Sequence, residues 1–476
     1  MSSLSNLFQG ISTVSQTGPE QEINQLCFDS RKAQAGSLFF AIPGTQVDGH
    51  QFLNQVYAQG CTAWVVQHVP TNIPADVTCI QVIDSNEALA DISCVFYGHP
   101  SKSVQLIGIT GTNGKTTSVT LLFELFKSLG HRCGLISTVV NKIQDRIIPA
   151  THTTPDAMHL NALLAEMLAD GCTHVFMEVS SHAVVQKRIH GLQFKGAISS
   201  NITRDHLDFH ETFDAYIKAK KGFFDALSAD SFALTNVDDK RGNVMLQNTL
   251  AKKYSYGLLN SADYKAKIIS NGIGGLQLDM EGKVMHAQLI GTFNAYNLLA
   301  IYATAMLLGE DQEEVLIQMS ALKTAPGRFD QLAGPNGKMG IVDYAHTPDA
   351  LENVLKTIQA IRSKNQRIIT VVGCGGNRDT GKRPIMAELA ALYSDAVVLT
   401  SDNPRFEDPE EILNQMEAGI PANSRGKVVR ISDRKTAIFT AIKDKAGFGD
   451  IILVAGKGHE TYQDIQGHKS DFDDKK

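Results

Sequence analysis

Residues 108–117 read GITGTNGKTT, and this short stretch decides the fold expected around it. The preceding residues 104–107 are VQLI, and the following residues 118–130 are SVTLLFELFKSLG. A short apolar run, a glycine-rich turn and apolar residues at helical spacing predict a strand, a loop and a helix. Gly111 and Gly114 allow backbone amides to approach an anion, and the start of the helix adds a positive dipole end. The stretch therefore predicts a loop that binds the phosphates of a nucleotide.

The loop departs by one residue from the general phosphate-loop pattern G-x-x-x-x-G-K-[ST], because Ile109 stands where the first glycine is required. Lys115 would neutralise the β and γ phosphates, and Thr116 would bind Mg²⁺. The alternative is a glycine-rich turn with a solvated lysine. The strand and helix patterns on either side favour nucleotide binding. The candidate ATP-binding residues of the loop are Gly111, Thr112, Asn113, Gly114, Lys115, Thr116 and Thr117.

The length and composition indicate a multidomain protein that acts on small molecules. A single core stops growing at about 250–300 residues, so a chain of 476 residues is expected to form three domains. Its 43% hydrophobic and 20% charged residues are ordinary for a globular protein. A net charge of −6, from 44 basic and 50 acidic residues, predicts neither nucleic acid nor an anionic membrane as a partner.

The cysteines and the N-terminus predict a cytoplasmic location. Seven scattered cysteines without a C-x-x-C pair are typical of buried thiols in a reducing compartment. The first residues, MSSLSNLFQGISTV, lack a basic segment before an apolar one. No apolar stretch approaches the roughly 20 residues that are needed to span a bilayer.

Three segments with different patterns predict three α/β domains. Residues 1–102 carry short mixed strands and end near YGHPSKS (97–103). Residues 103–327 alternate apolar strands with amphipathic helices, which predicts a P-loop NTPase-like domain with a parallel sheet. A proline- and glycine-rich break at 323–338 precedes a second alternation, so residues 328–476 are expected to form a Rossmann-like domain.

The stretch from 178 to 220 contains further candidate metal ligands. Glu178 follows the apparent strand THVFM, at the strand end where open α/β sheets place ligands. It is either a second Mg²⁺ ligand or a surface carboxylate. His206, Asp208 and His210 could bind a metal ion, but a histidine and aspartate cluster at the start of a helix is as often a simple helix cap.

Nine motifs in a fixed order give the chain a resemblance to a known family. They are TGTNGKTT, MEVSSHA, NITRDHLDFH, GTFNAYN, APGRFD, DYAHTPDAL, GGNRDTGKRP, SDNPR and GKGHE. In this order they resemble the Mur ligases of bacterial cell-wall synthesis, and the resemblance runs from Asp29 to about residue 463. It implies an ATP-dependent amide ligase that adds meso-diaminopimelate to UDP-N-acetylmuramoyl-L-alanyl-D-glutamate through an acyl phosphate.

The resemblance also implies roles for residues of the central domain. Lys115, Glu178, His206 and Lys220 are the implied catalytic residues. Thr116 and Glu178 would hold one Mg²⁺, and His206 with Lys220 a second. In the family, a lysine four positions after a tyrosine reacts with CO2 to form a carbamate, and Tyr216 and Lys220 have this spacing. Lys218 and Lys221 flank it, and spacing alone does not choose among the three. Carbamate formation requires a neutral amine, hence a lowered pKa.

Other ATP contacts are implied at the domain junctions. Arg328 would reach the phosphates and Asp343 the ribose, both from the third domain. Asn294 and Asn297 resemble residues that flank the nucleotide, although helix capping explains asparagines there equally well. Because two domains would contact ATP, catalysis is expected to depend on domain closure.

The first domain is expected to bind the UDP end of the substrate. Its implied contacts are Ser30, Thr45 and Gln46. The muramoyl-peptide would be bound in the central domain by hydroxyl and amide groups with one arginine, which suits a polar anionic ligand. These residues are Thr153, Thr154, Ser180, Gln186 and Arg188.

The motif DNPR is expected to select the amino acid. Diaminopimelate has a carboxylate that lysine lacks, so Arg405 would pair with this anion and Glu460 with the adjacent ammonium. The alternative for DNPR is an ordinary Asn-Pro turn with a surface arginine. The full implied set is Arg383, Asp402, Asn403, Pro404, Arg405, Gly456 and Glu460.

The sequence leaves two kinds of alternative function open. One is a related amide ligase, either folylpolyglutamate synthase or a lysine-adding enzyme, against which the DSR segment and Arg405 respectively argue. The other is a phosphate-loop switch protein that ligates nothing. A monomer is expected. Relatives usually continue into a final helix, whereas this sequence ends at HKSDFDDKK (468–476), so the third domain is expected to lack the stabilisation of that helix, while the active-site motifs all lie upstream.

Overall fold

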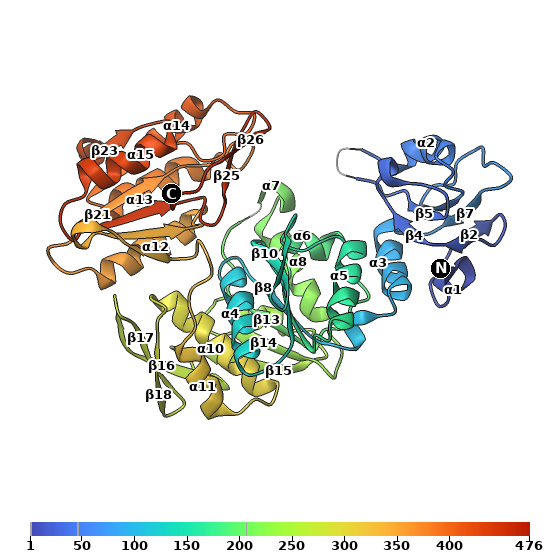
Figure 1. Ribbon diagram of the computed structural model, residues 1–476, viewed down its shortest axis with the longest axis horizontal. Helices are drawn as coiled ribbons and strands as arrows, with labels where there is room; N and C mark the ends of the chain where they lie inside the picture. Colours follow the sequence, from blue (N-terminus) through green and yellow to red (C-terminus); the bar gives the residue numbers. More distant parts are fainter. Residues whose placement is uncertain (1, 45–46, 206) are drawn as a thin grey trace. The chain divides into compact units, whose positions relative to one another are not determined.

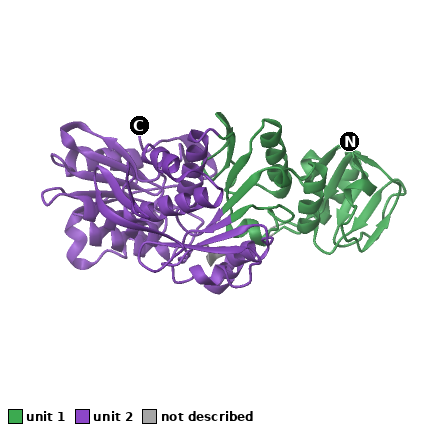
Figure 2. Cartoon of the chain, turned by 90° about the horizontal axis from the view of Figure 1, so that it is seen from below, with its two compact units in different colours: residues 1–108, 131–196 green, residues 109–130, 197–476 purple. Residues whose placement is uncertain are grey.

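The computed structural model describes residues 2–44, 47–205 and 207–476. The chain forms two compact units, one of residues 1–108 and 131–196 and the other of residues 109–130 and 197–476 (Figure 2). The chain therefore passes between the units three times. The predicted boundaries at 102 and 327 stay predictions.

The first sheet of unit 1 confirms the short strands expected near the N-terminus. Its strand order is β2-β7-β6-β5-β4, and only β2 runs antiparallel to its neighbour. Leu38 and Phe40 of β5 pack in one hydrophobic cluster and Phe39 in another, because alternate side chains point to opposite faces. The strands are β2 (Ser15–Thr17), β4 (Gln25–Cys27), β5 (Ser37–Phe40), β6 (Ala63–Val66) and β7 (Thr78–Gln81), with helices α1 (Leu4–Leu7), α2 (Leu53–Ala58) and α3 (Ser85–Phe96).

A second group of strands in unit 1 has the order β11-β10-β9-β12-β8. Strand β12 runs parallel to β9, but β10 and β11 form an antiparallel hairpin beside β9. The predicted parallel sheet therefore carries an antiparallel hairpin at this edge. The elements are β8 (Gln105–Thr110), β9 (Cys133–Ile136), β10 (Val140–Ile143), β11 (Arg146–Pro149), β12 (His174–Glu178), α5 (Ala157–Ala169) and α6 (Ser181–Val185).

Unit 2 begins with the loop and helix predicted from residues 108–130. Strand β8 ends at Thr110 and helix α4 (Lys115–Ser128) begins four residues after Gly111, as expected. The following strands have the order β13-β14-β15-β16-β17-β18. They are β13 (Gly196–Ser199), β14 (Phe232–Asn236), β15 (Lys252–Gly257), β16 (Tyr264–Gly272), β17 (Gly275–Met280) and β18 (Lys283–Ala287), with α7 (Leu207–His210), α8 (Phe213–Asp225), α9 (Gly242–Met245), α10 (Thr292–Leu307) and α11 (Gln312–Ser320).

The C-terminal part of unit 2 is a six-stranded sheet of order β19-β20-β24-β21-β22-β23 (Figure 1). All neighbouring strands run parallel except the pair β19 and β20. This arrangement confirms the second alternation of strands and helices. The strands are β19 (Asp330–Ala333), β20 (Met339–Asp343), β21 (Ile368–Val372), β22 (Ala396–Leu399), β23 (Val428–Arg430) and β24 (Ile451–Ala455), and the helices are α12 (Pro348–Ile361), α13 (Lys382–Tyr393), α14 (Pro409–Glu417) and α15 (Arg434–Thr440).

The register of this sheet brings several candidate residues to one edge. Asp343 pairs with Ala455, and Ala455 pairs with Val372, so β20, β24 and β21 end at the same level. The residues that follow these ends are where α/β sheets bind ligands. A hairpin of β25 (Tyr462–Ile465) and β26 (His468–Asp471) then follows the last strand. Across the part of the chain that is described, no helix has the length and apolar character to cross a membrane.

Candidate active site

The phosphate-loop candidate has a backbone that requires glycine at two positions. Gly111 has a φ of 148°, and a Cβ atom there would collide with the hydroxyl of Ser200. Gly114 is the N-cap of α4 with a φ of 88°, and a Cβ there would lie 2.7 Å from Asn297 Oδ1. Gly114 has no side chain to cap this helix end, so the loop keeps the amide-rich, positive end that suits a phosphate.

The strand end at β13 fixes the shape of the loop. The backbone N–H of Thr112 donates to the Asn201 carbonyl at 2.8 Å, and that of Asn113 donates to Asn201 Oδ1 at 2.9 Å. The Asn113 carbonyl accepts from Ser200 Oγ at 2.7 Å and from Asn201 Nδ2 at 2.9 Å. Asn201 was not predicted as a site residue, although it begins the motif NITRDHLDFH.

Two lysine side chains meet at one carbonyl oxygen of this loop. Nζ of Lys115 lies 2.8 Å from the Gly111 carbonyl oxygen and 2.9 Å from that of Thr112. Nζ of Lys220, which projects from α8, lies 2.8 Å from the same Gly111 oxygen. The Lys220 amine is 1% exposed, and burial together with the charge of Lys115 holds its pKa well below the usual value. Both effects favour the neutral amine that carbamate formation requires.

The structure distinguishes Lys220 from its neighbours, which spacing could not do. Lys218 is exposed, and Lys221 pairs with Asp225 at 2.6 Å. Lys220 instead lies 4.7 Å from the centre of the Tyr216 ring, and the Tyr216 hydroxyl lies 3.0 Å from Thr112 Oγ1. His206, the second predicted ligand, lies outside the described residues.

Glu178 is a buried carboxylate with an unused oxygen. It is the last residue of β12 and is fully shielded from solvent, so the alternative of a surface carboxylate is wrong. Oε1 accepts from the Thr138 N–H at 2.8 Å, while Oε2 has no hydrogen-bond partner among the described residues. Buried carboxylate oxygens are normally satisfied, and an orphaned one is a suitable ligand for a hard cation such as Mg²⁺.

The predicted muramoyl-peptide contacts gather beside the end of β12. Thr154 Oγ1 donates to the Glu178 carbonyl at 2.8 Å, and Arg188 Nη1 donates to the Thr154 carbonyl at 2.7 Å. Gln186 Oε1 accepts from Arg188 Nε at 2.9 Å, and Ser180 caps α6. Thr153 Oγ1 accepts from Thr138 at 3.0 Å. The five residues therefore form one connected polar cluster.

The predicted UDP contacts are only partly described. Ser30 is buried at the start of a short 3₁₀ turn, Ser30–Lys32, which Asp29 caps. Thr45 and Gln46 lie outside the described residues.

Arg328 joins the C-terminal part of unit 2 to the phosphate loop. Its Nη2 donates to Thr116 Oγ1 at 3.1 Å, and its guanidinium lies 4.6 Å from the centre of the Tyr344 ring. Nε is buried and has no partner among the described residues. Thr117 is buried in the first turn of α4. This guanidinium therefore lies where it can meet a phosphate held by the loop.

Asp343 supports the backbone near Arg328. Its Oδ2 accepts from the Phe329 N–H at 2.6 Å, and burial raises its pKa to about 6. Its predicted contact with a ribose stays a prediction.

The two candidate asparagines of α10 connect helices. Asn297 Nδ2 donates to Asn294 Oδ1 at 3.0 Å, and Asn294 Nδ2 donates to the Ile290 carbonyl at 2.8 Å. Ser118 Oγ, on α4, donates to Asn297 Oδ1 at 3.4 Å. The N-cap of α10 is Gly291, so neither asparagine caps this helix.

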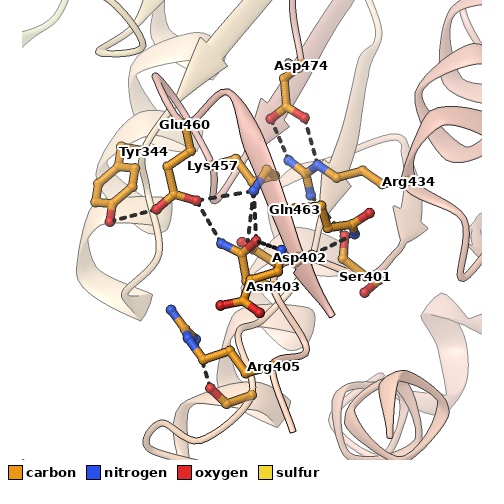
Figure 3. A network of polar contacts seen from close by, with 12 residues as sticks. Tyr344, Ser401, Asp402, Asn403, Arg405, Arg434, Lys457, Glu460, Gln463 and Asp474 are labelled. Carbon is orange, nitrogen blue, oxygen red and sulfur yellow. Dashed lines mark hydrogen bonds and ion pairs between the residues drawn. The ribbon is translucent and has the colours of Figure 1, made fainter. Parts of the chain in front are cut away.

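The candidate amino-acid pocket is centred on Asn403 (Figure 3). Its Nδ2 donates to Glu460 Oε2 at 2.7 Å, and its Oδ1 accepts from Lys457 Nζ at 3.1 Å. Lys457, which was not predicted, is completely buried and also lies 3.1 Å from Glu460 Oε2. The Tyr344 hydroxyl donates to the other Glu460 oxygen at 3.4 Å. Glu460 is therefore held in place by three partners.

Arg405 occupies a constrained position at the edge of this pocket. Its φ is 52°, its N–H donates to the Asp464 carbonyl at 3.0 Å, and its Nη1 donates to the Gly376 carbonyl at 2.8 Å. Of the described residues, none places a carboxylate within ion-pair distance of this guanidinium. The Pro404 carbonyl accepts from the Glu407 N–H, so the motif does contain the turn that the alternative interpretation expects. The side chain of its arginine, however, is held by a hydrogen bond.

The remaining predicted pocket residues differ in role. Gly456 has a φ of 115°, and a Cβ there would lie 2.6 Å from Asp402 Oδ2. Burial raises the pKa of Asp402. Arg383 is completely buried and pairs with Glu407 at 2.9 Å and with Gln415 at 2.8 Å. These observed contacts of Arg383 are structural, and its predicted contact with an amino acid stays a prediction.

Family models match most of the chain. The Mur ligase middle domain matches residues 109–305, the Mur ligase glutamate ligase domain residues 327–458, and the Mur ligase family catalytic domain residues 22–97.

Full-length relatives and a solved structure agree with these matches. The UDP-N-acetylmuramoyl-L-alanyl-D-glutamate–2,6-diaminopimelate ligase of Cytophaga hutchinsonii is 57% identical over 474 residues, which cover 99% of this chain and 97% of that protein. The protein of the same name from Bacteroides thetaiotaomicron is 51% identical over 99% of this chain and 98% of its own length. A solved structure of a ligase of this name has 34% identity and a TM-score of 0.67, covering 95% of this chain and 93% of the other. The chain belongs to the Mur ligase family and has its three-domain α/β fold.

Proposed function

We propose that the protein is an ATP-dependent amide ligase that adds meso-diaminopimelate to UDP-N-acetylmuramoyl-L-alanyl-D-glutamate in peptidoglycan precursor synthesis. The full-length similarity to ligases of that name supports the reaction. The pocket at Asn403 carries the proposal, because it pairs a fixed carboxylate, Glu460, with a nearby arginine that has no carboxylate partner among the described residues. Such a pair suits an amino acid that has both an ammonium and a carboxylate at its far end.

The reaction proceeds in two steps. The terminal carboxylate of the nucleotide-linked peptide attacks the γ-phosphorus of ATP, so that an acyl phosphate forms and ADP leaves. The amine of diaminopimelate then attacks the acyl carbon, loses a proton and expels inorganic phosphate. Both steps bring anions together, so the protein contributes mainly positive charge and positioned amides.

The phosphate loop and Arg328 supply much of this positive charge. Lys115 turns from the loop carbonyls toward the β and γ phosphates, while the uncapped start of α4 offers its amides. Arg328, with a buried Nε that lacks a partner among the described residues, contacts the transferred phosphate. Asn294, Asn297 and Asp343 complete the nucleotide site, and closure of the domains on ATP assembles it.

Lys220 can bind a metal ion only when it carries a carbamate. Its neutral Nζ attacks CO2, a C–N bond forms, and the proton that the nitrogen loses passes to water. The product is an anionic oxygen donor like those that Mg²⁺ prefers. Bound Mg²⁺ would neutralise phosphate oxygens. Thr116 and Glu178 would hold one ion, His206 and carbamylated Lys220 would hold a second, and the orphaned Glu178 Oε2 fits the first of these roles.

The nucleotide-linked peptide binds through hydroxyls, amides and one arginine. Thr153, Thr154, Ser180, Gln186 and Arg188 bind the muramoyl-peptide, and the hydrogen bonds that join the last four of them support a shared role. Ser30, Thr45 and Gln46 bind the UDP end. We further propose that the protein is a cytoplasmic monomer.

Amino-acid-dependent release of phosphate tests the proposed function. Phosphate release is measured with ATP and Mg²⁺, with or without the nucleotide-linked dipeptide, and with diaminopimelate, lysine or no amino acid. Release is expected only with both the dipeptide and diaminopimelate. Equal phosphate release with lysine would support a lysine-adding ligase. Phosphate release that depends on neither the dipeptide nor the amino acid would support a phosphate-loop switch protein.

A further inference from the structure

A buried ion pair fastens the C-terminal tail to the last sheet. Arg434 is the first residue of α15, and Asp474 lies in the tail after β26. Arg434 Nε donates to Asp474 Oδ1 at 2.7 Å, and Nη2 donates to Oδ2 at 2.6 Å. Both side chains are completely shielded from solvent. The tail therefore contributes a bidentate, fully buried contact to this part of the chain.

The same guanidinium joins the two strand ends that lead into the amino-acid pocket. Nη2 of Arg434 donates to the Ala455 carbonyl at 3.1 Å, and Nη1 donates to the Ser401 carbonyl at 3.4 Å. Ser401 immediately precedes Asp402 and Asn403, and Ala455 immediately precedes Gly456 and Lys457. Arg434 thus fixes the spacing of two loops whose side chains meet at Asn403 (Figure 3).

The hairpin that precedes Asp474 holds the same pocket from its other side. Gln463 Nε2 donates to the Asp402 carbonyl at 2.7 Å, and the Asp464 N–H donates to Asn403 Oδ1 at 2.9 Å. The Asp464 carbonyl accepts from the Arg405 N–H at 3.0 Å. The backbone of Arg405 therefore depends on the position of this hairpin.

The charges of the cluster explain why Asp474 is needed. Asp402, beside the pocket, is also close enough to Arg434 to feel its charge. A buried cation that loses its partner destabilises the fold, and it is attracted to any other anion nearby. Without the carboxylate of Asp474, Arg434 would pull toward Asp402 and displace the loop that carries Asn403.

We propose that the hairpin of residues 462–471 and the side chain of Asp474 form a C-terminal clamp, anchored by Arg434, that positions the loops of the amino-acid pocket and sets the affinity for the incoming amino acid. The proposal rests on the proposed ligase function. Neither Arg434 nor Asp474 needs to touch the substrate, so both are positioning residues. Loosening the clamp is expected to weaken amino-acid binding while the phosphate loop, in another part of the unit, keeps its ATP affinity.

Steady-state kinetics on the full chain tests this inference. Asp474→Asn removes the charge from the buried pair but keeps its size, and Asp473→Asn is the matched control, since Asp473 is the partly exposed neighbour. We expect Asp474→Asn to raise KM for diaminopimelate about tenfold, with KM for ATP changed less than about twofold. The control is expected to leave both values unchanged. Equal effects on both KM values, or a lower kcat with normal KM values, would overturn the clamp.

A second variant keeps the test decisive if Asp474→Asn folds poorly. Gln463→Leu leaves the buried ion pair intact and removes only the bond to the Asp402 carbonyl, at a partly exposed position. The same selective rise in KM for diaminopimelate is expected, with an unchanged melting temperature. A normal KM in this variant would refute the clamp. Unmutated protein that shows no amino-acid-dependent phosphate release would refute the proposed function instead, so the two failures are distinguishable.

Discussion

Replacing Arg405 by alanine is expected to abolish the preference for diaminopimelate over lysine. The two amino acids differ by one carboxylate, and among the described residues the guanidinium of Arg405 has one acceptor, the Gly376 carbonyl. Most of its five N–H donors therefore stay available for a ligand carboxylate. Because alanine, like arginine, is an L-residue with a Cβ, the substitution leaves the strain of the 52° φ unchanged.

The magnitude follows from the loss of one charge-assisted bidentate interaction. Hydrogen bonds to charged groups contribute about 1.5–3 kcal/mol, which corresponds to a factor of roughly 10 to 150 in kcat/KM. The lost bond to the Gly376 carbonyl affects both amino acids equally, so the ratio of their kcat/KM values isolates the carboxylate contact. Arg405→Lys keeps the charge but loses the planar fork and is expected to be intermediate.

The assay compares kcat/KM for diaminopimelate and for lysine by phosphate release at saturating ATP and nucleotide-linked dipeptide. The exposed Arg425, in the same domain, is replaced by alanine as the control and is expected to keep the preference. A ratio that is unchanged in Arg405→Ala would refute the assignment of Arg405. A ratio lowered equally by Arg425→Ala would show that net charge, rather than this contact, selects the amino acid.

Three further outcomes are expected. Glu178→Gln keeps the bond from the Thr138 N–H but removes the anion, so the Mg²⁺ concentration for half-maximal activity should rise at least about tenfold, with little change in melting temperature. Lys220→Met should lose a ¹³C carbamate signal that the unmutated protein shows with labelled bicarbonate, and its activity should fall about a hundredfold or more because a metal ligand is gone. Asp343 has a folded-state pKa of about 6, above its unfolded value, so its stabilisation is present at low pH and is lost as the pH rises through 6. Relative to Asp343→Asn, the unmutated protein should therefore lose about 3 kcal/mol of unfolding free energy between pH 4 and 7 in urea titrations.

The phosphate loop and the strand ends were predictable because they depend on local sequence. Apolar runs followed by glycine or acidic residues located Gly111, Glu178 and Asn403 at the ends of strands, and all three lie there. The choice of Lys220 over Lys218 and Lys221 could not be made from local sequence. It depends on which face of α8 is buried beside the loop, a tertiary property that spacing does not encode.

Contacts between distant segments were not predictable from local pattern. Arg434 and Asp474 are 40 positions apart, and each looks like an ordinary surface charge in the sequence. The antiparallel strands between 264 and 287 were also not predicted, and in the first of them a register shift between Ile268 and Ser270 interrupts the alternation. Lys457 lay inside a quoted motif, yet a lysine between glycines gives no sign that it is fully buried.

The shared carbonyl of Gly111 connects the phosphate loop to the chemistry of Lys220. Two amines lie 2.8 Å from the same oxygen, and two ammonium groups so close would repel strongly in a buried site. Burial and the charge of Lys115 therefore hold the pKa of the Lys220 amine well below its usual value, which favours the neutral form that carbamate formation requires. Once Lys220 carries a carbamate, the sign of the interaction reverses, because an anion now lies beside Lys115. In the proposed reaction, the charge of Lys115 would therefore favour the neutral Lys220 amine before the modification and would pair with the carbamate after it.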